Sequence, residues 1–206
     1  VEIDRDLADL VRDRFGDRIT LVEGDCLAKG RRLAQEVVSA LEGSPFKLVA
    51  NLPYQAASPL MASLLMHHPE CSGQWVTIQK EVVDRLVAVP GTKAWGPLTA
   101  IVRAFATARR IAVLPPGCFW PSPKVTSAMA ELQPCPQDAR PSDPDGFARF
   151  VTKLLSQRRK QIGGVLGHEI AASLGIEPQT RAETLSAEQL LALRGCLPPD
   201  HHLLQQ

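Results

Sequence analysis

The sequence predicts an α/β fold in which a largely parallel sheet carries helices on both faces, followed by a small all-helical domain. Short apolar runs alternate with helix-like periodicity over residues 1–133, a pattern typical of a parallel sheet with crossover helices. Residues 134–146 are rich in proline and other turn formers, which indicates a linker. Residues 147–206 contain amphipathic helix patterns and no convincing strand. We therefore expect a sheet domain at 1–133 and a helical domain at 147–206.

The individual elements follow from local periodicity. Short apolar strands are expected at residues 19–22, 47–50, 75–79, 109–114 and 125–132. Helices are expected from about Asp4, at 33–41, from about Ser58 with Pro59 in its first turn, at 82–87, 97–106, 147–155, 170–174 and 187–197. The first of these helices has one apolar face, formed by Leu7, Leu10, Val11 and Phe15. The last two strands follow each other directly, which suggests an antiparallel end to the sheet.

Composition excludes several classes of protein. The hydrophobic fraction is 45% and the charged fraction is 22%, as in ordinary globular proteins. The net charge is only +1, so any basic binding surface must be local. The 5 cysteines are scattered without a C-x-x-C pair, which favours reduced thiols in a cytoplasmic protein over a disulfide framework or a metal site. No apolar run reaches membrane-spanning length, so we expect no membrane partner.

The tetrapeptide Asn51-Leu52-Pro53-Tyr54 stands where the strand at 47–50 ends. Ligands of open α/β sheets bind at the carboxyl ends of the strands. The amide of Asn51 offers both a donor and an acceptor, and Pro53 restricts the backbone beside it. Together with the ring of Tyr54, this pattern suits a flat, hydrogen-bonding group such as a nucleobase. The alternative is a plain turn with Tyr54 packed under a helix.

Two acidic residues follow other apparent strands. Glu2 stands in the stretch VEID and Asp25 in the stretch GDC. Carboxylates at strand ends can accept hydrogen bonds from a ribose and from an adenine amino group. Either residue alone would more often cap a helix. With the turn at Asn51, these two acids place polar groups at three successive strand ends, which favours a ligand site.

Four motifs and three longer segments carry a resemblance to a known family. The motifs are VEID (1–4), GDC (24–26), NLPY (51–54) and FWPSPKV (119–125), and the segments are 79–99, 156–166 and 178–193. In this order the chain resembles the rRNA adenine N6,N6-dimethyltransferases of the KsgA type over nearly its whole length. NLPY-like tetrapeptides occur in many amino-methyltransferases. The segments at 156–166 and 178–193 favour this family over the Erm-type enzymes.

The resemblance implies a Rossmann-like class I methyltransferase sheet with S-adenosylmethionine as cofactor. It implies that Glu2 binds the ribose hydroxyls, with Ile3 against the adenine ring of the cofactor. Asp25 would accept from the adenine amino group near the backbone of Cys26. Asn51 would border the cofactor as well as the substrate.

The resemblance also implies a base site and an RNA surface. Asn51 and the carbonyl of Leu52, held by Pro53, would bind the N6 amino group of the target adenine. Tyr54 and Phe119 would stack on its two faces. The basic cluster of Arg158, Arg159 and Lys160 would contact RNA phosphates, although such clusters also occur on plain solvated surfaces.

The implied activity is dimethylation of N6 on adjacent adenosines near the 3′ end of small-subunit (16S) rRNA, with a role in ribosome biogenesis. The partner would be small-subunit rRNA or the immature small subunit, and the chain would act as a monomer without a metal. Two alternatives are open: a non-catalytic rRNA-binding assembly factor, and Erm-type methylation of large-subunit rRNA.

The chain departs from the family pattern at two places. Thr126 stands where the family carries aspartate. The family also begins with a basic arm, a first strand and a glycine-rich loop, and we find no counterpart of these before Val1. We therefore expect the chain to be part of a longer protein and to bind the cofactor weakly by itself.

Overall fold

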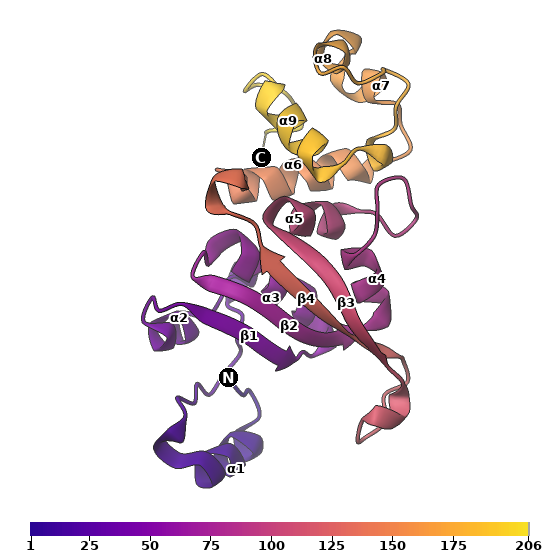
Figure 1. Ribbon diagram of the computed structural model, residues 1–206. Helices are drawn as coiled ribbons and strands as arrows, with labels where there is room; N and C mark the ends of the chain where they lie inside the picture. The colour runs from indigo at the N-terminus through magenta and orange to yellow at the C-terminus, as the bar shows by residue number, and fades with distance from the viewer. Residues whose placement is uncertain (206) are drawn as a thin grey trace.

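The computed structural model describes residues 1–205 and shows a mixed α/β protein built on a four-stranded sheet (Figure 1). The strands are β1 (Phe46–Asn51), β2 (Cys71–Gln79), β3 (Ala106–Leu114) and β4 (Ser127–Pro134). Their order is β1-β2-β4-β3. Strand β1 runs parallel to β2, and β4 runs antiparallel to both of its neighbours. The α/β class and the antiparallel end of the sheet are thus confirmed.

The helices before residue 134 are α1 (Arg5–Phe15), α2 (Gln35–Leu41), α3 (Tyr54–His67), α4 (Lys80–Leu86) and α5 (Pro97–Phe105). Those after it are α6 (Pro144–Ser156), α7 (Ile162–Leu166), α8 (His168–Ser173) and α9 (Ala187–Cys196). Short 3-10 turns add η1 (Gly16–Arg18), η2 (Lys29–Arg31), η3 (Pro116–Cys118), η4 (Gln137–Ala139) and η5 (Ala182–Thr184). Within residues 1–205, no helix has the length and apolar character needed to cross a membrane.

One face of the sheet forms the core. Val76, Ile78, Ala128 and Ala130 point to this face and are at most 1% exposed. Helices α3, α4 and α5 pack against it, and α5 contacts both α3 and α4. The opposite face of β1 is open within the described residues, and Val49 is 77% exposed there. The sheet therefore buries its apolar side chains mainly through one layer of helices, and not through helices on both faces as the sequence predicted.

Two expected elements differ from the structure. No strand forms at 19–22; this region makes only an isolated parallel bridge between Glu2 and Glu23. Helix α3 begins at Tyr54 and not near Ser58, because Pro53 has extended backbone and its carbonyl accepts from Ala56 and Ala57. Pro59 consequently lies inside the helix, where it has no N–H to donate to the preceding turn.

The apolar face of α1 is largely exposed. Leu7 is 50% and Leu10 is 61% exposed, whereas Ala8 is buried. Figure 1 shows α1 set apart from the sheet, next to the N-terminus. The amphipathic pattern therefore predicted the helix correctly but did not predict burial of that face.

The helical segment α6–α9 packs on α5 through a core that is continuous with that of the sheet (Figure 1). Phe105 in α5 meets Phe147 in α6 edge to face, with ring centroids 6.4 Å apart. Helix α6 begins at Pro144, three residues before the expected start at residue 147, because Asp143 caps it by accepting from the Gly146 N–H at 2.9 Å. The domain boundaries at 133 and 147 stay a prediction.

Replacing Phe147 by alanine should lower the free energy of unfolding by about 3–5 kcal/mol, because the ring is fully buried in the shared core. Urea unfolding followed by far-ultraviolet circular dichroism and by tryptophan fluorescence would measure this loss. We expect both signals to shift together, since Trp95 is buried in the core and Trp75 lies in strand β2 of the sheet. Phe15→Ala, which removes a ring that is 39% exposed, should cost far less. Separate transitions would contradict a shared core.

Candidate active site at the end of strand β1

The tetrapeptide Asn51-Leu52-Pro53-Tyr54 joins β1 to α3. Leu52 is 7% exposed, and its N–H donates to the carbonyl of Thr77 at 3.1 Å, which extends the pairing of β1 with β2 by one residue. Asn51 and Pro53 on either side are exposed. Pro53 is the N-cap of α3, and Tyr54 is the first residue of that helix. The buried leucine thus anchors a turn whose polar and aromatic groups face outward.

A cavity of about 400 Å³ opens at this turn. Its lining consists of Asn51, Leu52, Pro53, Tyr54, Phe119, Trp120, Pro121, Pro123 and Ser127. The structure therefore brings together all five residues that the sequence assigned to the base site. Within residues 1–205, neither the side-chain amide of Asn51 nor the carbonyl of Leu52 has a hydrogen-bond partner. Both groups are available to a ligand, and Tyr54 supplies an aromatic ring that is 42% exposed.

A second cavity, of about 800 Å³, borders the same turn. Its lining includes the five residues that the sequence assigned to the cofactor: Glu2, Ile3, Asp25, Cys26 and Asn51. The two cavities share Asn51, Leu52 and Pro53. The two cavities therefore adjoin each other at this turn.

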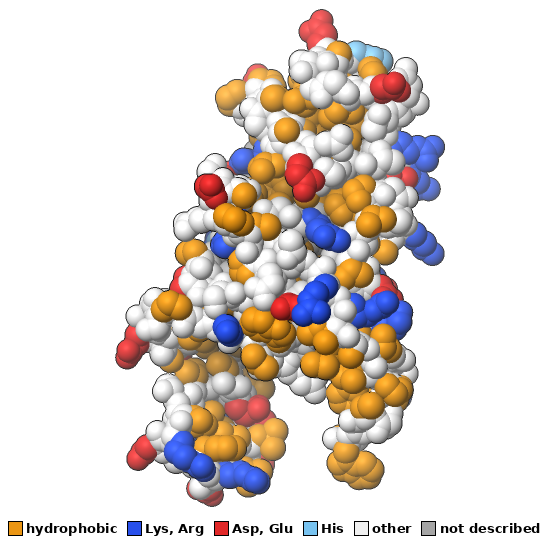
Figure 2. Space-filling model, viewed as in Figure 1, with side chains coloured by type: hydrophobic (Ala, Val, Ile, Leu, Met, Phe, Trp, Pro, Cys, Tyr) orange, Lys and Arg blue, Asp and Glu red, His pale blue; other side chains and the backbone are white. Residues whose placement is uncertain are grey.

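Figure 2 shows the molecule hollowed between two projections. One is the N-terminal part around α1, and the other is the segment around η3. Strand β1 ends between them in Figure 1. The site is therefore open to solvent on the side where a large substrate could approach.

Glu2 and Asp25 reach the larger cavity from irregular backbone, not from the ends of sheet strands as expected. The Glu2 N–H donates to the Val22 carbonyl at 3.0 Å, and the Gly24 N–H donates to the Glu2 carbonyl at 2.8 Å. These bonds hold the first residues beside the turn that carries Asp25. Gly24 has φ of +147°, a conformation that side-chain-bearing residues rarely adopt, so glycine is required there.

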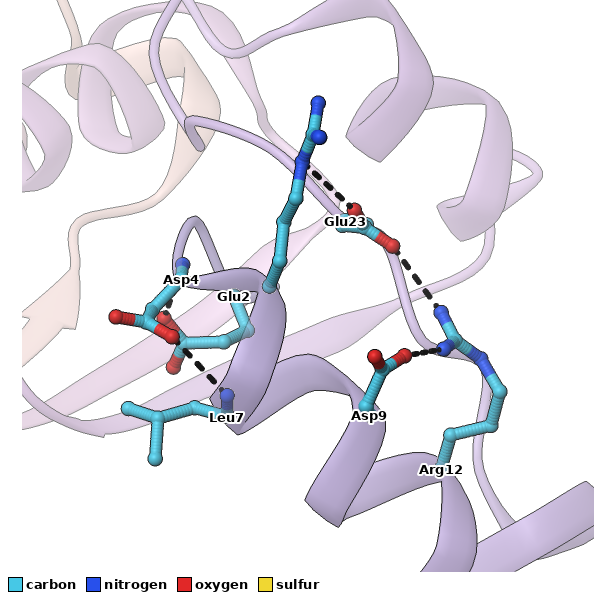
Figure 3. Close-up of polar contacts among 7 residues, drawn as sticks. Glu2, Asp4, Leu7, Asp9, Arg12 and Glu23 are labelled. Atoms are coloured by element: carbon cyan, nitrogen blue, oxygen red, sulfur yellow. Dashed lines mark hydrogen bonds and ion pairs between the residues drawn. The ribbon is translucent and has the colours of Figure 1, made fainter.

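Local polar contacts around α1 hold Glu2 and the residues near it (Figure 3). The Asp4 N–H donates to Glu2 Oε1 at 2.9 Å, and the Leu7 N–H donates to Asp4 Oδ1 at 3.1 Å, which caps α1. Arg12 donates to Glu23 at 3.1 Å. Such exposed ion pairs each add little stability, so the backbone bonds are the main connection of this part.

The other residues that the sequence assigned to the cofactor, Cys26 and Ile3, add apolar surface to the larger cavity. Burial, followed by the nearby Asp25 carboxylate, raises the pKa of the Cys26 thiol, so this side chain stays neutral. The Cys26 carbonyl accepts from the Ala34 N–H at 2.9 Å. Ile3 is 68% exposed beside the cavity. Acceptors together with apolar surface match a ribose and a flat adenine ring, so the residues present fit the implied cofactor.

Sequence reasoning missed several lining residues. Arg31 borders the larger cavity with a left-handed backbone, φ +62°, which is strained for a residue with a side chain. Gln55 also borders it. Trp120 was visible only as part of the FWPSPKV motif, and no periodic signal distinguishes an exposed ring from a buried one. Helix or strand patterns cannot identify residues that loops bring to a cavity.

The turn at Thr126 keeps one contact that needs no particular side chain. The Thr126 carbonyl accepts from the Lys80 N–H at 3.0 Å and so ties the start of β4 to the start of α4. This bond involves only main-chain atoms, so the threonine that replaces the family's aspartate leaves it in place.

The basic cluster 158–160 divides into two kinds of residue. Arg158 is half-buried: its Nε donates to Glu183 at 2.6 Å, and its terminal nitrogens donate to the carbonyls of Thr92 and Lys93 at 3.3 and 3.5 Å. It therefore connects the end of α6 to the loop before α5. Arg159 and Lys160 are exposed. Figure 2 shows Lys and Arg side chains along the right-hand edge of the molecule, the side on which α6 ends in Figure 1.

The fold is similar to those of two solved structures. A dimethyladenosine transferase from Plasmodium falciparum superimposes with a TM-score of 0.75 at 20% identity, covering 93% of this chain and 78% of that chain. The 23S rRNA methyltransferase ErmE superimposes with a TM-score of 0.62 at 20% identity, covering 95% and 80%. At this identity, the likeness concerns the fold.

Sequence comparison identifies the family. The profile of the ribosomal RNA adenine dimethylase family matches residues 1–197. Ribosomal RNA small subunit methyltransferase A of Erwinia tasmaniensis is 35% identical over 205 residues, covering 96% of this chain and 73% of the relative. The protein of the same name from Bordetella bronchiseptica is 36% identical over 203 residues, covering 96% and 74%. The chain belongs to the ribosomal RNA adenine dimethylase family.

Proposed function

We propose that this protein transfers methyl groups from S-adenosylmethionine to N6 of adjacent adenosines near the 3′ end of small-subunit rRNA, during ribosome biogenesis. Family membership supports the reaction, and the names of its relatives support the small-subunit target. The observation that carries the proposal is the pair of cavities that share Asn51, Leu52 and Pro53. In this proposal the chain acts as a monomer in the cytoplasm.

In this proposal, the larger cavity holds the cofactor through Glu2 and Asp25, with Ile3 and Cys26 as apolar contacts. When bound, the cofactor supplies a methyl group on a positively charged sulfur, which is already a good electrophile. The chain therefore needs no covalent nucleophile of its own. The shared turn then has one task, to place the acceptor nitrogen in line with the donor.

The smaller cavity positions the target adenine. Its exocyclic nitrogen is a poor nucleophile, because its lone pair is delocalised into the ring. The free carbonyl oxygens of Asn51 and Leu52 accept hydrogen bonds from this amino group and favour the geometry in which the lone pair is available. Tyr54 and Phe119 hold the ring between them. Positioning of this kind is sensitive, since a misplacement of about 1 Å can cost about a hundredfold in rate.

RNA contact in this proposal involves Arg159 and Lys160 outside the cavities. Arg158, by contrast, is occupied by Glu183 and two backbone carbonyls, so we assign it to the structure of the surface and not to phosphate binding. Exposed Lys93, whose carbonyl Arg158 holds, is adjacent to the same surface.

Replacing Tyr54 by alanine should lower methyl transfer at least tenfold while changing cofactor affinity less than twofold. The reason is that Tyr54 lines the smaller cavity, proposed for the base, and not the larger cavity, proposed for the cofactor. Stacking of a base on an aromatic ring is worth about 1–3 kcal/mol. Transfer of tritiated methyl groups to unmethylated small-subunit rRNA, with nucleoside analysis for dimethyladenosine, would measure the reaction. Calorimetry would measure cofactor binding. Tyr54→Phe, which keeps the ring, is the matched control. Equal losses of binding and transfer would contradict the assignment, and label in large-subunit rRNA alone would favour the Erm-type alternative.

Replacing Arg159 and Lys160 together by glutamine should weaken RNA binding and flatten its dependence on salt. Each lost phosphate contact should reduce the slope of log affinity against log salt by about 0.7 to 0.9. RNA binding measured across a salt series would test this. As a control, Arg158→Gln should lower thermal stability and leave the slope nearly unchanged. An unchanged slope in the double variant would show that these two residues form an ordinary solvated surface.

A further inference from the structure

Trp120 is exposed to an unusual degree for its size. It lies between Phe119 and Pro121 in the segment that joins β3 to β4, and it is 98% exposed. Tryptophan is generally one of the more buried residues of a folded protein. Within residues 1–205, no aromatic ring pairs with it and no cationic group lies over it. The fold itself therefore gives no reason for this side chain.

Hydrogen bonds within residues 115–122 hold the backbone on both sides of Trp120. The Cys118 N–H donates to the Pro115 carbonyl at 3.0 Å, and the Phe119 N–H donates to the Pro116 carbonyl at 3.2 Å. The Ser122 hydroxyl donates to the same Pro116 carbonyl at 3.1 Å. Prolines on both sides restrict the chain further. A ligand that contacts the ring thus meets a prearranged segment and needs to order little of it.

The position of Trp120 identifies its partner. It lines the smaller cavity together with Tyr54 and Phe119, which are proposed to hold the target adenine. The segment around η3 projects away from the sheet in Figure 1, and Figure 2 shows hydrophobic side chains at the end of this projection. An RNA strand that places one base in the cavity must carry the adjoining nucleotide past this rim. Exposed aromatic rings bind such unpaired bases by stacking, with little regard to sequence.

We infer that Trp120 stacks on the unpaired nucleotide that adjoins the target adenosine. This inference rests on the proposed function and adds a substrate feature to it, namely a requirement for an unpaired flank. A nucleotide held in a duplex keeps its faces stacked on its neighbours and cannot offer one to the ring. Trp120 would thereby position RNA and select single-stranded targets without touching the reacting atoms.

The test uses the full chain and two labelled RNA hairpins with the target adenosine in the loop. One hairpin is intact, and the other has an abasic residue next to the target. Trp120→Ala should weaken binding of the intact hairpin about tenfold and binding of the abasic hairpin less than twofold. Trp120→Phe should retain most of the affinity. Val113→Ala, which shortens an exposed apolar side chain outside both cavities, should change neither. In methyl transfer, Trp120→Ala should raise KM for RNA and leave kcat within about twofold.

Three results would overturn the inference. They are an unchanged affinity in Trp120→Ala, an equal loss on both hairpins, and a loss that appears only with assembled subunits, which would indicate a protein partner for the ring. If the wild-type chain methylates the intact hairpin and Tyr54→Ala does not, any of these results removes the role of Trp120 but leaves the proposed function in place. If the wild-type chain binds no adenosine-containing hairpin and methylates none at a saturating concentration of the cofactor, the proposed function fails, and this inference fails with it.

Discussion

The burial of Leu52 at the end of β1 is the constraint on which the site depends. Its side chain enters the core and its N–H continues the pairing with β2 through Thr77, so the turn cannot move without disrupting the sheet. Asn51 and Pro53 are thereby held outward as a wall shared by two cavities. One rigid turn can then fix the relative position of two ligands, which is the main requirement of a reaction that needs alignment and no covalent catalyst.

The helical segment contributes to this site indirectly. Its core is continuous with that of the sheet through Phe105 and Phe147, and Arg158 holds the loop before α5 by two hydrogen bonds, to the carbonyls of Thr92 and Lys93. The exposed basic residues after Arg158 therefore stand on a surface that is fixed relative to the cavities. An extended RNA could contact this surface and the base site at once, so that affinity and positioning come from different parts of one rigid body.

The sequence predicted the features that depend on local patterns. The α/β class, the antiparallel end of the sheet and the turn at Asn51–Tyr54 follow from strand runs and from turn chemistry, and the structure has them. The expected strand at 19–22 does not form, because pairing depends on neighbouring strands that an apolar run cannot specify. The start of α3 was placed too late, because the capping role of Pro53 is a matter of backbone conformation.

Arg158 was grouped with its neighbours, although its partners Thr92, Lys93 and Glu183 are remote in sequence. The exposure of Trp120 depends on long-range geometry in the same way.

In the proposed reaction, the shared turn places two ligands within reach of each other. The most direct measurement is calorimetric titration with a compound that links N6 of adenosine to the sulfur position of an S-adenosylhomocysteine analogue. If the cavities adjoin as described, the linked compound should bind about a hundredfold or more tightly than S-adenosylhomocysteine alone, since its second half binds intramolecularly. Tyr54→Ala should remove most of that gain and leave binding of S-adenosylhomocysteine unchanged. A linked compound that binds no more tightly than S-adenosylhomocysteine would contradict the claim.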